Sequence, residues 1–237
     1  MKRKIMETIP FYINLLFILT TLLTVYFFWK ASASRPAILL VALWLLLQAA
    51  ISLTGFYTIA DTVPPRFLFL VLPPFLLIAV LFTSARGRNF IDQLDLKWLT
   101  LLHVVRIPVE LTLLGLFIVH YVPQIMTFEG RNLDILSGIS AIIVYYFVFY
   151  KKKSSLRLLL GWNIICLGLL LNIVVIAILS APFPFQRFGL DQPNRAILIF
   201  PFAWLPAAIV PLVLFSHLVA IRRLLKPAKM PVARLVP

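Results

Sequence analysis

Long apolar runs constrain the fold of this chain more than any motif does. Each run is about long enough to cross a hydrocarbon core of ~30 Å, which takes about 20 helical residues. Charged residues make up 13% of the chain, where an average soluble domain has about 25%, and they fall between the runs. Because backbone that faces lipid must satisfy its hydrogen bonds internally, such runs predict helices. The sequence therefore predicts an all-α, polytopic integral membrane protein.

Prolines, glycines and charged clusters divide the apolar sequence into a bundle of seven predicted transmembrane helices, of which the fifth is the shortest. The predicted spans are Ile9 to Trp29, Pro36 to Ile59, Pro64 to Ser84, Trp98 to Val122, Leu133 to Tyr150, Leu156 to Ala181 and Ala196 to Leu218. Between two of them, Asn89 to Lys97 forms either a short amphipathic piece on the membrane surface or a plain loop. We expect one transmembrane domain over residues 1–222 and a flexible, basic, proline-containing tail over 223–237.

The distribution of lysine and arginine predicts the orientation. With seven spans, fourteen basic residues fall on the side of the C-terminus and seven on the side of the N-terminus. Cytoplasmic loops carry the excess, so the N-terminus is expected outside and the C-terminus in the cytoplasm of a bacterial-type inner (plasma) membrane. The basic start at Lys2, Arg3 and Lys4 argues against this orientation.

The basic residues also indicate which partners to expect. The isoelectric point is near 10.4, but the basic residues form short clusters at helix ends, which does not predict binding to nucleic acid. Membrane lipids are the expected partners, and the cytoplasmic clusters would suit anionic headgroups. No feature identifies a partner protein.

Ionisable residues inside the bilayer are expensive, and the fourth predicted span contains a cluster of them. His103, Arg106 and Glu110 stand at offsets of three, four and seven residues, which places them on one helical face. Arg106 and Glu110 can pair at this spacing, although this order of charges is the weaker one and needs support from a neighbouring helix. Pro108 frees the carbonyl of Val104 and favours a kink. The cluster is either a buried ion pair that joins helices or a site for a ligand, proton or ion.

Polar residues of other spans can join this cluster. His103, Asn163 and His217 are predicted at a similar depth, roughly 7 to 9 Å from the cytoplasmic ends of their spans, so that they can meet in one layer. Trp44 and Gln48 share a face of the second span, which fits a packing seam or a ligand contact. The predicted ligand-binding residues are His103, Arg106, Glu110, Gln48, Trp44, Asn163 and His217.

The sequence predicts neither a catalytic group nor a metal site. The single cysteine, Cys166, lies in an apolar segment and excludes an internal disulfide and a cysteine metal cluster. Adjacent helical residues such as Ser216 and His217 point about 100° apart and pair poorly as nucleophile and base. The topology resembles that of rhodopsins, but the seventh span has no lysine for a retinal Schiff base.

These observations favour a non-enzymatic membrane protein that binds, senses or transports a small anionic or amphipathic, or lipid-like, ligand through a polar site around His103, Arg106 and Glu110. Three alternatives stay open. The chain can be a structural or partner-binding subunit, or an intramembrane enzyme. It can also be a b-type haem protein, with His103 and His217 as axial ligands and Arg222 or Arg223 at the propionates. The cofactor is otherwise unknown.

Overall fold

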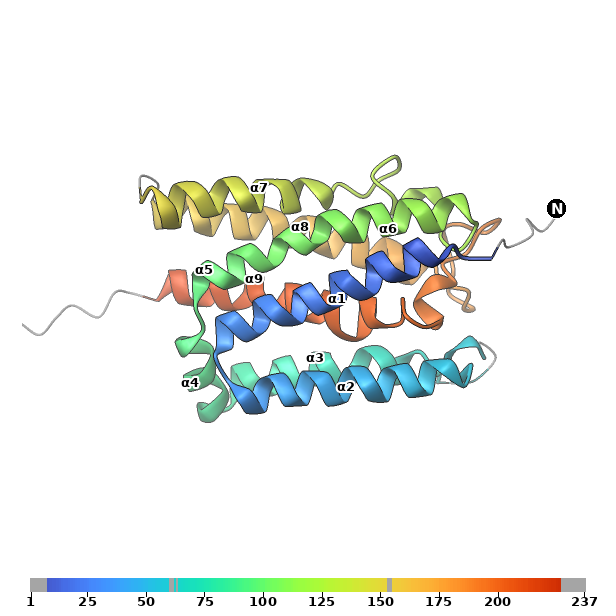
Figure 1. The fold of residues 1–237 in the computed structure, drawn as a ribbon, viewed down its shortest axis with the longest axis horizontal. Coiled ribbons are helices and arrows are strands. Elements are labelled where there is room, and N and C mark those ends of the chain that lie inside the picture. Colours follow the sequence, from blue (N-terminus) through green and yellow to red (C-terminus); the bar gives the residue numbers. More distant parts are fainter. Residues whose placement is uncertain (1–7, 60–61, 63, 153–154, 227–237) are drawn as a thin grey trace, which may run out of the picture.

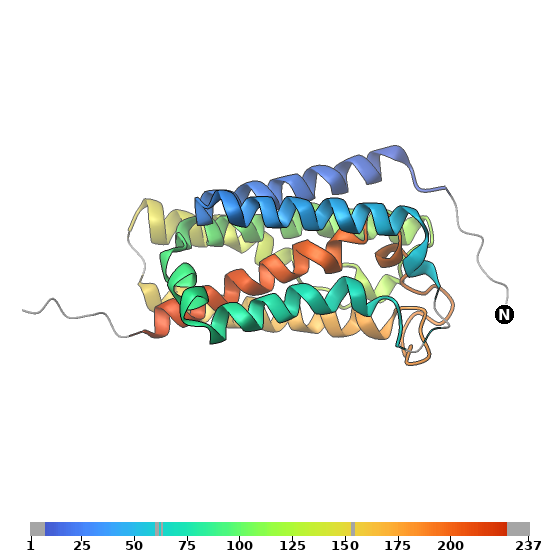
Figure 2. The same ribbon diagram turned by 90° about the horizontal axis from the view of Figure 1, so that it is seen from below.

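The predicted apolar runs form helices that lie side by side and run between the two ends of the molecule (Figures 1 and 2). The computed structural model describes residues 8–59, 62, 64–152 and 155–226. Its α-helices are α1 Phe11–Ser32, α2 Arg35–Leu53, α3 Leu68–Thr83, α4 Ala85–Gln93, α5 Leu96–Leu102, α6 Arg106–Ile118, α7 Ile135–Tyr145, α8 Leu156–Leu179 and α9 Val210–Leu225. The short 3-10 and π segments are η1 Phe56–Thr58, η2 His103–Val105, η3 Gln124–Met126, η4 Tyr146–Tyr150, η5 Ala196–Leu198 and η6 Leu205–Ile209.

Several of these helices are long and apolar enough to cross a membrane. Within the described residues there are five, or up to six if the bent pair α3 and α4 counts as one span. The segment from α5 to α6, Leu96–Ile118, counts as one of the five, and α7 with η4 forms a shorter apolar helix, Ile135–Tyr150. Many leucine and isoleucine side chains on the helix surfaces are exposed, as lipid-facing residues are. The chain is a multi-pass integral membrane protein.

The last span departs from the prediction at both of its ends. The sequence predicted a helix from Ala196 to Leu218, whereas the spanning segment runs over Leu205–Leu225. Pro201 precedes this segment and has no N–H to continue a helix, which delays its start. Pro206 and Pro211 stand in the first turns of η6 and α9, where a helix does not need their N–H. Regular α-helix begins only at Val210, after the π-helical turn η6. At the other end α9 takes in part of the predicted tail, and the rest of that tail, residues 227–237, lies outside the described residues.

A sharp bend separates α3 from α4. The two helix axes differ by 93°, so α4 lies across the end of the bundle (Figure 1). Ser84 stands at the bend, where its hydroxyl accepts from the Gly87 N–H at 3.0 Å and caps α4. A Cβ at Gly87 would meet the Leu81 backbone, 2.7 Å from its carbonyl carbon, so only glycine allows this close turn. Helix α4 covers part of the segment for which the sequence left an amphipathic piece or a loop open.

Candidate functional site

Arg106 lies at the centre of a buried polar cluster. It begins α6, and its guanidinium contacts residues at the start of α7, on α8 and on α9. Nη1 lies 3.2 Å from Oδ1 of Asp134 and donates to the Cys166 carbonyl at 3.4 Å, while Nη2 lies 3.1 Å from Nε2 of His217. Arg106 and Asp134 are both almost fully buried. A single side chain therefore links four helices inside the bundle.

The ion pair of Arg106 with Glu110 that the spacing allowed is not formed. In the described part of the chain the ion-pair partner of Arg106 is Asp134, at the N-terminal end of α7. Glu110 instead accepts from Nδ2 of Asn132 at 2.5 Å, and the same amide donates to the Met126 carbonyl at 2.9 Å. The reason is that the loop before α7 enters the bundle, so that Asn132 and Asp134 are buried and reach both charged residues.

The two histidines meet as their predicted depths suggested. The rings of His103 and His217 stack with centroids 3.9 Å apart and planes inclined by 20°. Trp162 of α8 packs edge-on against His103 at 5.3 Å, and its indole N–H donates to Oγ of Ser140 at 2.9 Å. Nδ1 of His217 lies 2.9 Å from Oδ1 of Asn163. His103, Asn163 and His217 thus share one layer.

The hydrogen bonds assign the tautomer of His217. Arg106 can only donate, so Nε2 of His217 accepts from it, and Nδ1 must carry the hydrogen that goes to Oδ1 of Asn163. Asn163 in turn donates from Nδ2 to the Leu159 carbonyl at 2.8 Å. Both ring nitrogens of His217 are therefore occupied by protein partners.

This geometry does not fit a haem. Two axial imidazoles must approach the iron from opposite faces of the macrocycle, each with a free ring nitrogen. The imidazoles of His103 and His217 instead lie in van der Waals contact, face to face, and His217 has no nitrogen left for iron. Arg222 and Arg223, the predicted propionate partners, bond to α4 and to the residue after it, at Asp92 and Leu94. The haem interpretation is not supported.

The sequence reasoning missed Asp134, Asn132 and Trp162. Asp134 carried a usable signal, because it stands three and seven residues before Ser137 and Ala141, on the small-residue face of the same helix. Both small residues are fully buried, and a Cβ at the neighbouring Gly138 would lie 2.8 Å from Cγ1 of Ile107. An acidic residue on so tightly packed a face needs a buried cation as its partner.

Trp44 and Gln48 lie apart from the polar cluster. Gln48, toward the C-terminal end of α2, accepts from the hydroxyl of Tyr57 at 2.5 Å, and both side chains are buried. The indole N–H of Trp44 donates to the Ala207 carbonyl in η6 at 2.9 Å. The structure therefore divides the seven predicted ligand-binding residues into a group of five around Arg106 and two residues on α2.

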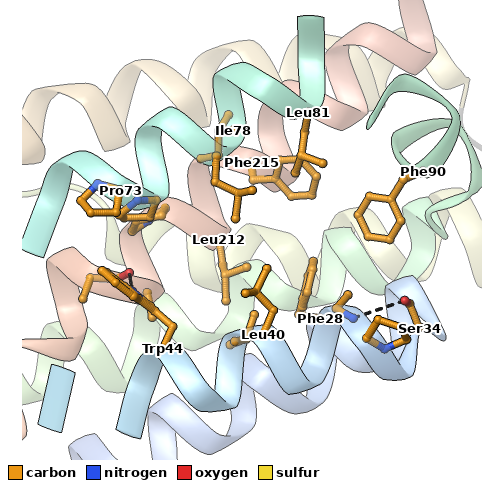
Figure 3. Close-up of a pocket in the computed structure, with 18 residues that line it drawn as sticks. Phe28, Ser34, Leu40, Trp44, Pro73, Ile78, Leu81, Phe90, Leu212 and Phe215 are labelled. Atoms are coloured by element: carbon orange, nitrogen blue, oxygen red, sulfur yellow. Dashed lines mark hydrogen bonds between the residues drawn. The ribbon is translucent and has the colours of Figure 1, made fainter. Parts of the chain in front are cut away.

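Trp44 lines an apolar groove between α2 and α3 (Figure 3). The groove has a volume of about 540 Å³, with η6 and α9 as its floor. Figure 3 shows Leu40 and Trp44 on one side, Ile78 and Leu81 on the other, and Leu212 between them. The lining residues are Phe28, Ser34, Pro36, Ala37, Leu40, Val41, Trp44, Pro73, Pro74, Leu77, Ile78, Leu81, Phe90, Ala207, Ala208, Pro211, Leu212 and Phe215.

A second pocket lies at the opposite end of the molecule, between α6 and the loop before α9. Its volume is about 500 Å³, and Arg187 and Asp191 contribute to its lining. Neither this pocket nor the apolar groove is lined by His103, Arg106, Glu110, Asn163 or His217. The polar cluster and the two cavities are therefore separate features.

Helix α4 covers one end of the apolar groove, where Phe90 joins its lining. Side chains at the end of α9 and directly after it hold α4 in this position. Lys226 donates to the Asp92 carboxylate, Arg222 Nε lies 3.7 Å from the other carboxylate oxygen, and Arg223 donates to the Leu94 carbonyl. We call these contacts of Asp92 and Leu94 the α4 clasp.

The chain belongs to the family described as a domain of unknown function, DUF8737, whose model matches residues 64–225. The matched segment includes the polar cluster, α4, and the α3 and α9 sides of the apolar groove. No curated protein matches the chain, and no solved structure matches it.

Proposed function

We propose that this member of the DUF8737 family is a seven-span, non-enzymatic membrane protein that binds a lipid-like molecule in the apolar groove between α2 and α3. The observation that carries the proposal is the groove itself, about 540 Å³ in volume and lined almost entirely by hydrocarbon. Leu40 and Leu77, on its two sides, remain 54% and 43% exposed, so nothing in the described chain fills the space between them.

The polar atoms of the lining favour an apolar occupant. Oγ of Ser34 already accepts from the Ala37 N–H, and the indole N–H of Trp44 already donates to Ala207. A ligand inside the groove therefore meets carbon. Because an acyl chain leaves a bilayer that is equally apolar, its binding there depends on van der Waals packing against the lining and not on transfer out of water. An acyl or isoprenoid chain satisfies this chemistry.

The span count and the orientation belong to the same proposal. We take α7 with η4 as a short fifth span and α3 as the third, which makes seven passes, runs the first and last helices in the same direction and puts the two termini on opposite sides of the membrane. The start of α2, helix α4 and the end of α9 then lie together at one end (Figure 1). The excess of basic residues at this end supports a cytoplasmic location for it.

We assign the polar cluster a structural role, as a buried ionic junction of four helices. His217 and Asn163 make their hydrogen bonds to the protein, and so do Nη1 and Nη2 of Arg106, whose Nε is buried without a partner among the described residues. Neither cavity reaches these three residues. Breaking a buried ion pair is costly, whereas an intact one tends to fix a single arrangement of helices. This assignment moves the ligand site from His103, Arg106 and Glu110 to the groove at Trp44.

Lipid retention tests the proposal. Leu40→Trp places an indole in the groove, whereas Leu39→Trp adds the same side chain to a neighbouring position of α2 that is 59% exposed and does not line the groove. Both proteins are purified in mild detergent and examined by native mass spectrometry for bound lipid. We expect the unsubstituted protein and Leu39→Trp to retain lipid, and Leu40→Trp to lose most of it.

Equal retention by the two tryptophan variants would contradict the proposal, and so would an unsubstituted protein that carries no lipid. In the latter case the interpretation as a structural or partner-binding subunit would take its place.

A further inference from the structure

The length of the groove matches one leaflet of a bilayer. Its lining on α2 extends from Pro36 to Trp44, and on α3 from Pro73 to Leu81. Eight residues of helix rise about 12 Å, slightly less than half of a ~30 Å hydrocarbon core. The groove starts at the first turn of α2 and ends near the middle of the bundle, so it lies within the leaflet that surrounds the basic end of the molecule.

Two arginines stand at the mouth of the groove. Arg35 directly precedes the lining residue Pro36, and Arg86 is four residues before Phe90, which places it on the same side of α4. Both arginines are exposed, and neither forms an ion pair within the described residues.

Several other charged residues near the mouth already have protein partners. Lys30 lies 5.1 Å from the centre of the Trp98 ring, and Arg88 donates to the Thr83 carbonyl. Asp92 is held in the α4 clasp, and Asp95 caps α5 by accepting from the Lys97 N–H at 2.8 Å. The acidic side chains near the mouth are therefore occupied, and the positive charge of Arg35 and Arg86 remains available.

We infer that the occupant of the groove is an anionic phospholipid of the surrounding leaflet, with one acyl chain between α2 and α3 and its phosphate held by Arg35 and Arg86. The inference rests on the proposed function and adds the headgroup. Guanidinium groups match phosphate geometry with paired donors. A zwitterionic headgroup would bring its own cation to a mouth that is already positive, so the site selects net negative charge.

Quenching of Trp44 fluorescence by brominated lipid measures whether an acyl chain lies in the groove and whether an anionic headgroup is preferred. The full chain is reconstituted into phosphatidylcholine bilayers that contain a small fraction of brominated phosphatidylglycerol or, in a matched sample, brominated phosphatidylcholine. The contribution of Trp44 is obtained by subtracting the emission of a Trp44→Phe protein in the same bilayers. We expect about tenfold stronger quenching per brominated lipid from phosphatidylglycerol, since each arginine near the surface contributes to anionic lipid binding.

Arg35→Gln/Arg86→Gln removes both mouth charges and is expected to abolish this preference while quenching by either lipid continues. Arg157→Gln is the matched control, an exposed arginine at the start of α8 that does not line the groove, and it should keep the preference. Equal quenching by the two lipids in the unsubstituted protein would overturn the inference, and so would an equal loss in the control. No quenching by either lipid would overturn the proposed function itself.

Discussion

Two carboxylates lie near Arg106, and their surroundings differ. Asp134 forms the buried ion pair with the guanidinium. Glu110 bonds through one oxygen to Asn132, and its second oxygen, Oε2, is buried without a hydrogen-bond partner among the described residues. Asp134 is therefore the residue that balances the charge of Arg106, and the stability of the helix junction depends on it.

Asp134→Asn leaves Arg106 buried without its counterion. Removing one partner of a buried pair typically costs about 3 to 5 kcal/mol, so we expect a large fall in thermal stability in detergent. The double substitution Arg106→Gln/Asp134→Asn removes the uncompensated charge and should recover part of the loss. Glu129→Gln, at an exposed carboxylate of the same loop, is the control and should behave like the unsubstituted protein. A single Asp134→Asn variant as stable as this control would show that the ion pair does not hold the junction.

At this scale the sequence predicted the residue types of the cluster but not all of the pairs. The common depth of His103, Asn163 and His217 followed from the distance of each to its basic flank, and the rings do meet. The partner of Arg106 did not follow, because a short-range rule favoured Glu110 and could not show that the loop at Asn132 enters the bundle.

At the scale of elements, the α4 clasp fixes how α4 covers the groove. The hydrogen bond from Lys226, together with the charges of Arg222 and Arg223, holds the pKa of Asp92 below its ordinary value of 3.8. A carboxylate with a lowered pKa stabilises the fold above its unfolded pKa and loses that effect as the pH falls through the lowered value. The clasp is thus intact at neutral pH and opens only in strong acid.

A spin label on α4 reports this opening. Asn89→Cys offers an exposed labelling position, while the native Cys166 is buried. We expect low mobility of the label at neutral pH and higher mobility as the pH falls below about 4. With Asp92→Asn in addition, mobility should be high at neutral pH already, and acid should add little.

Because the ion pair of Asp92 with Lys226 is partly exposed, its contribution is at most about 1 kcal/mol, and a change of a few fold in the mobile fraction of the label is expected. Identical pH profiles for the two proteins would show that Asp92 does not hold α4.

Some helices could be predicted from the sequence more accurately than others. Long runs without proline, such as α1 and α8, appear where the hydropathy placed them, because backbone in lipid has few alternatives to a helix. The last span was predicted to start too early, since the apolar run through Pro201 still scores as a span although a proline there has no N–H to continue a helix.

At the scale of the whole molecule, the sequence predicted a multi-pass helical bundle but not its groove. A groove depends on which helices stay apart, and α2 and α3 both pack on the last span while leaving space between them. Hydropathy treats lipid-facing and groove-facing leucines alike, so Leu40 cannot be distinguished from Leu39 by composition. For the same reason the sequence placed Trp44 in a packing seam or a ligand contact without deciding between them.

Mapping a photoreactive lipid onto the protein tests the central claim, that the space between α2 and α3 holds a lipid chain. Phosphatidylglycerol with a diazirine in its acyl chain is irradiated with the protein in bilayers, and the adducts are located by peptide mass spectrometry. We expect adducts concentrated on Leu40, Leu77 and Leu212, and few on the neighbouring Leu39 and Leu76, which lie outside the groove. Adducts spread evenly over both sets would mean that lipid meets this protein only as surrounding solvent, and would contradict the claim.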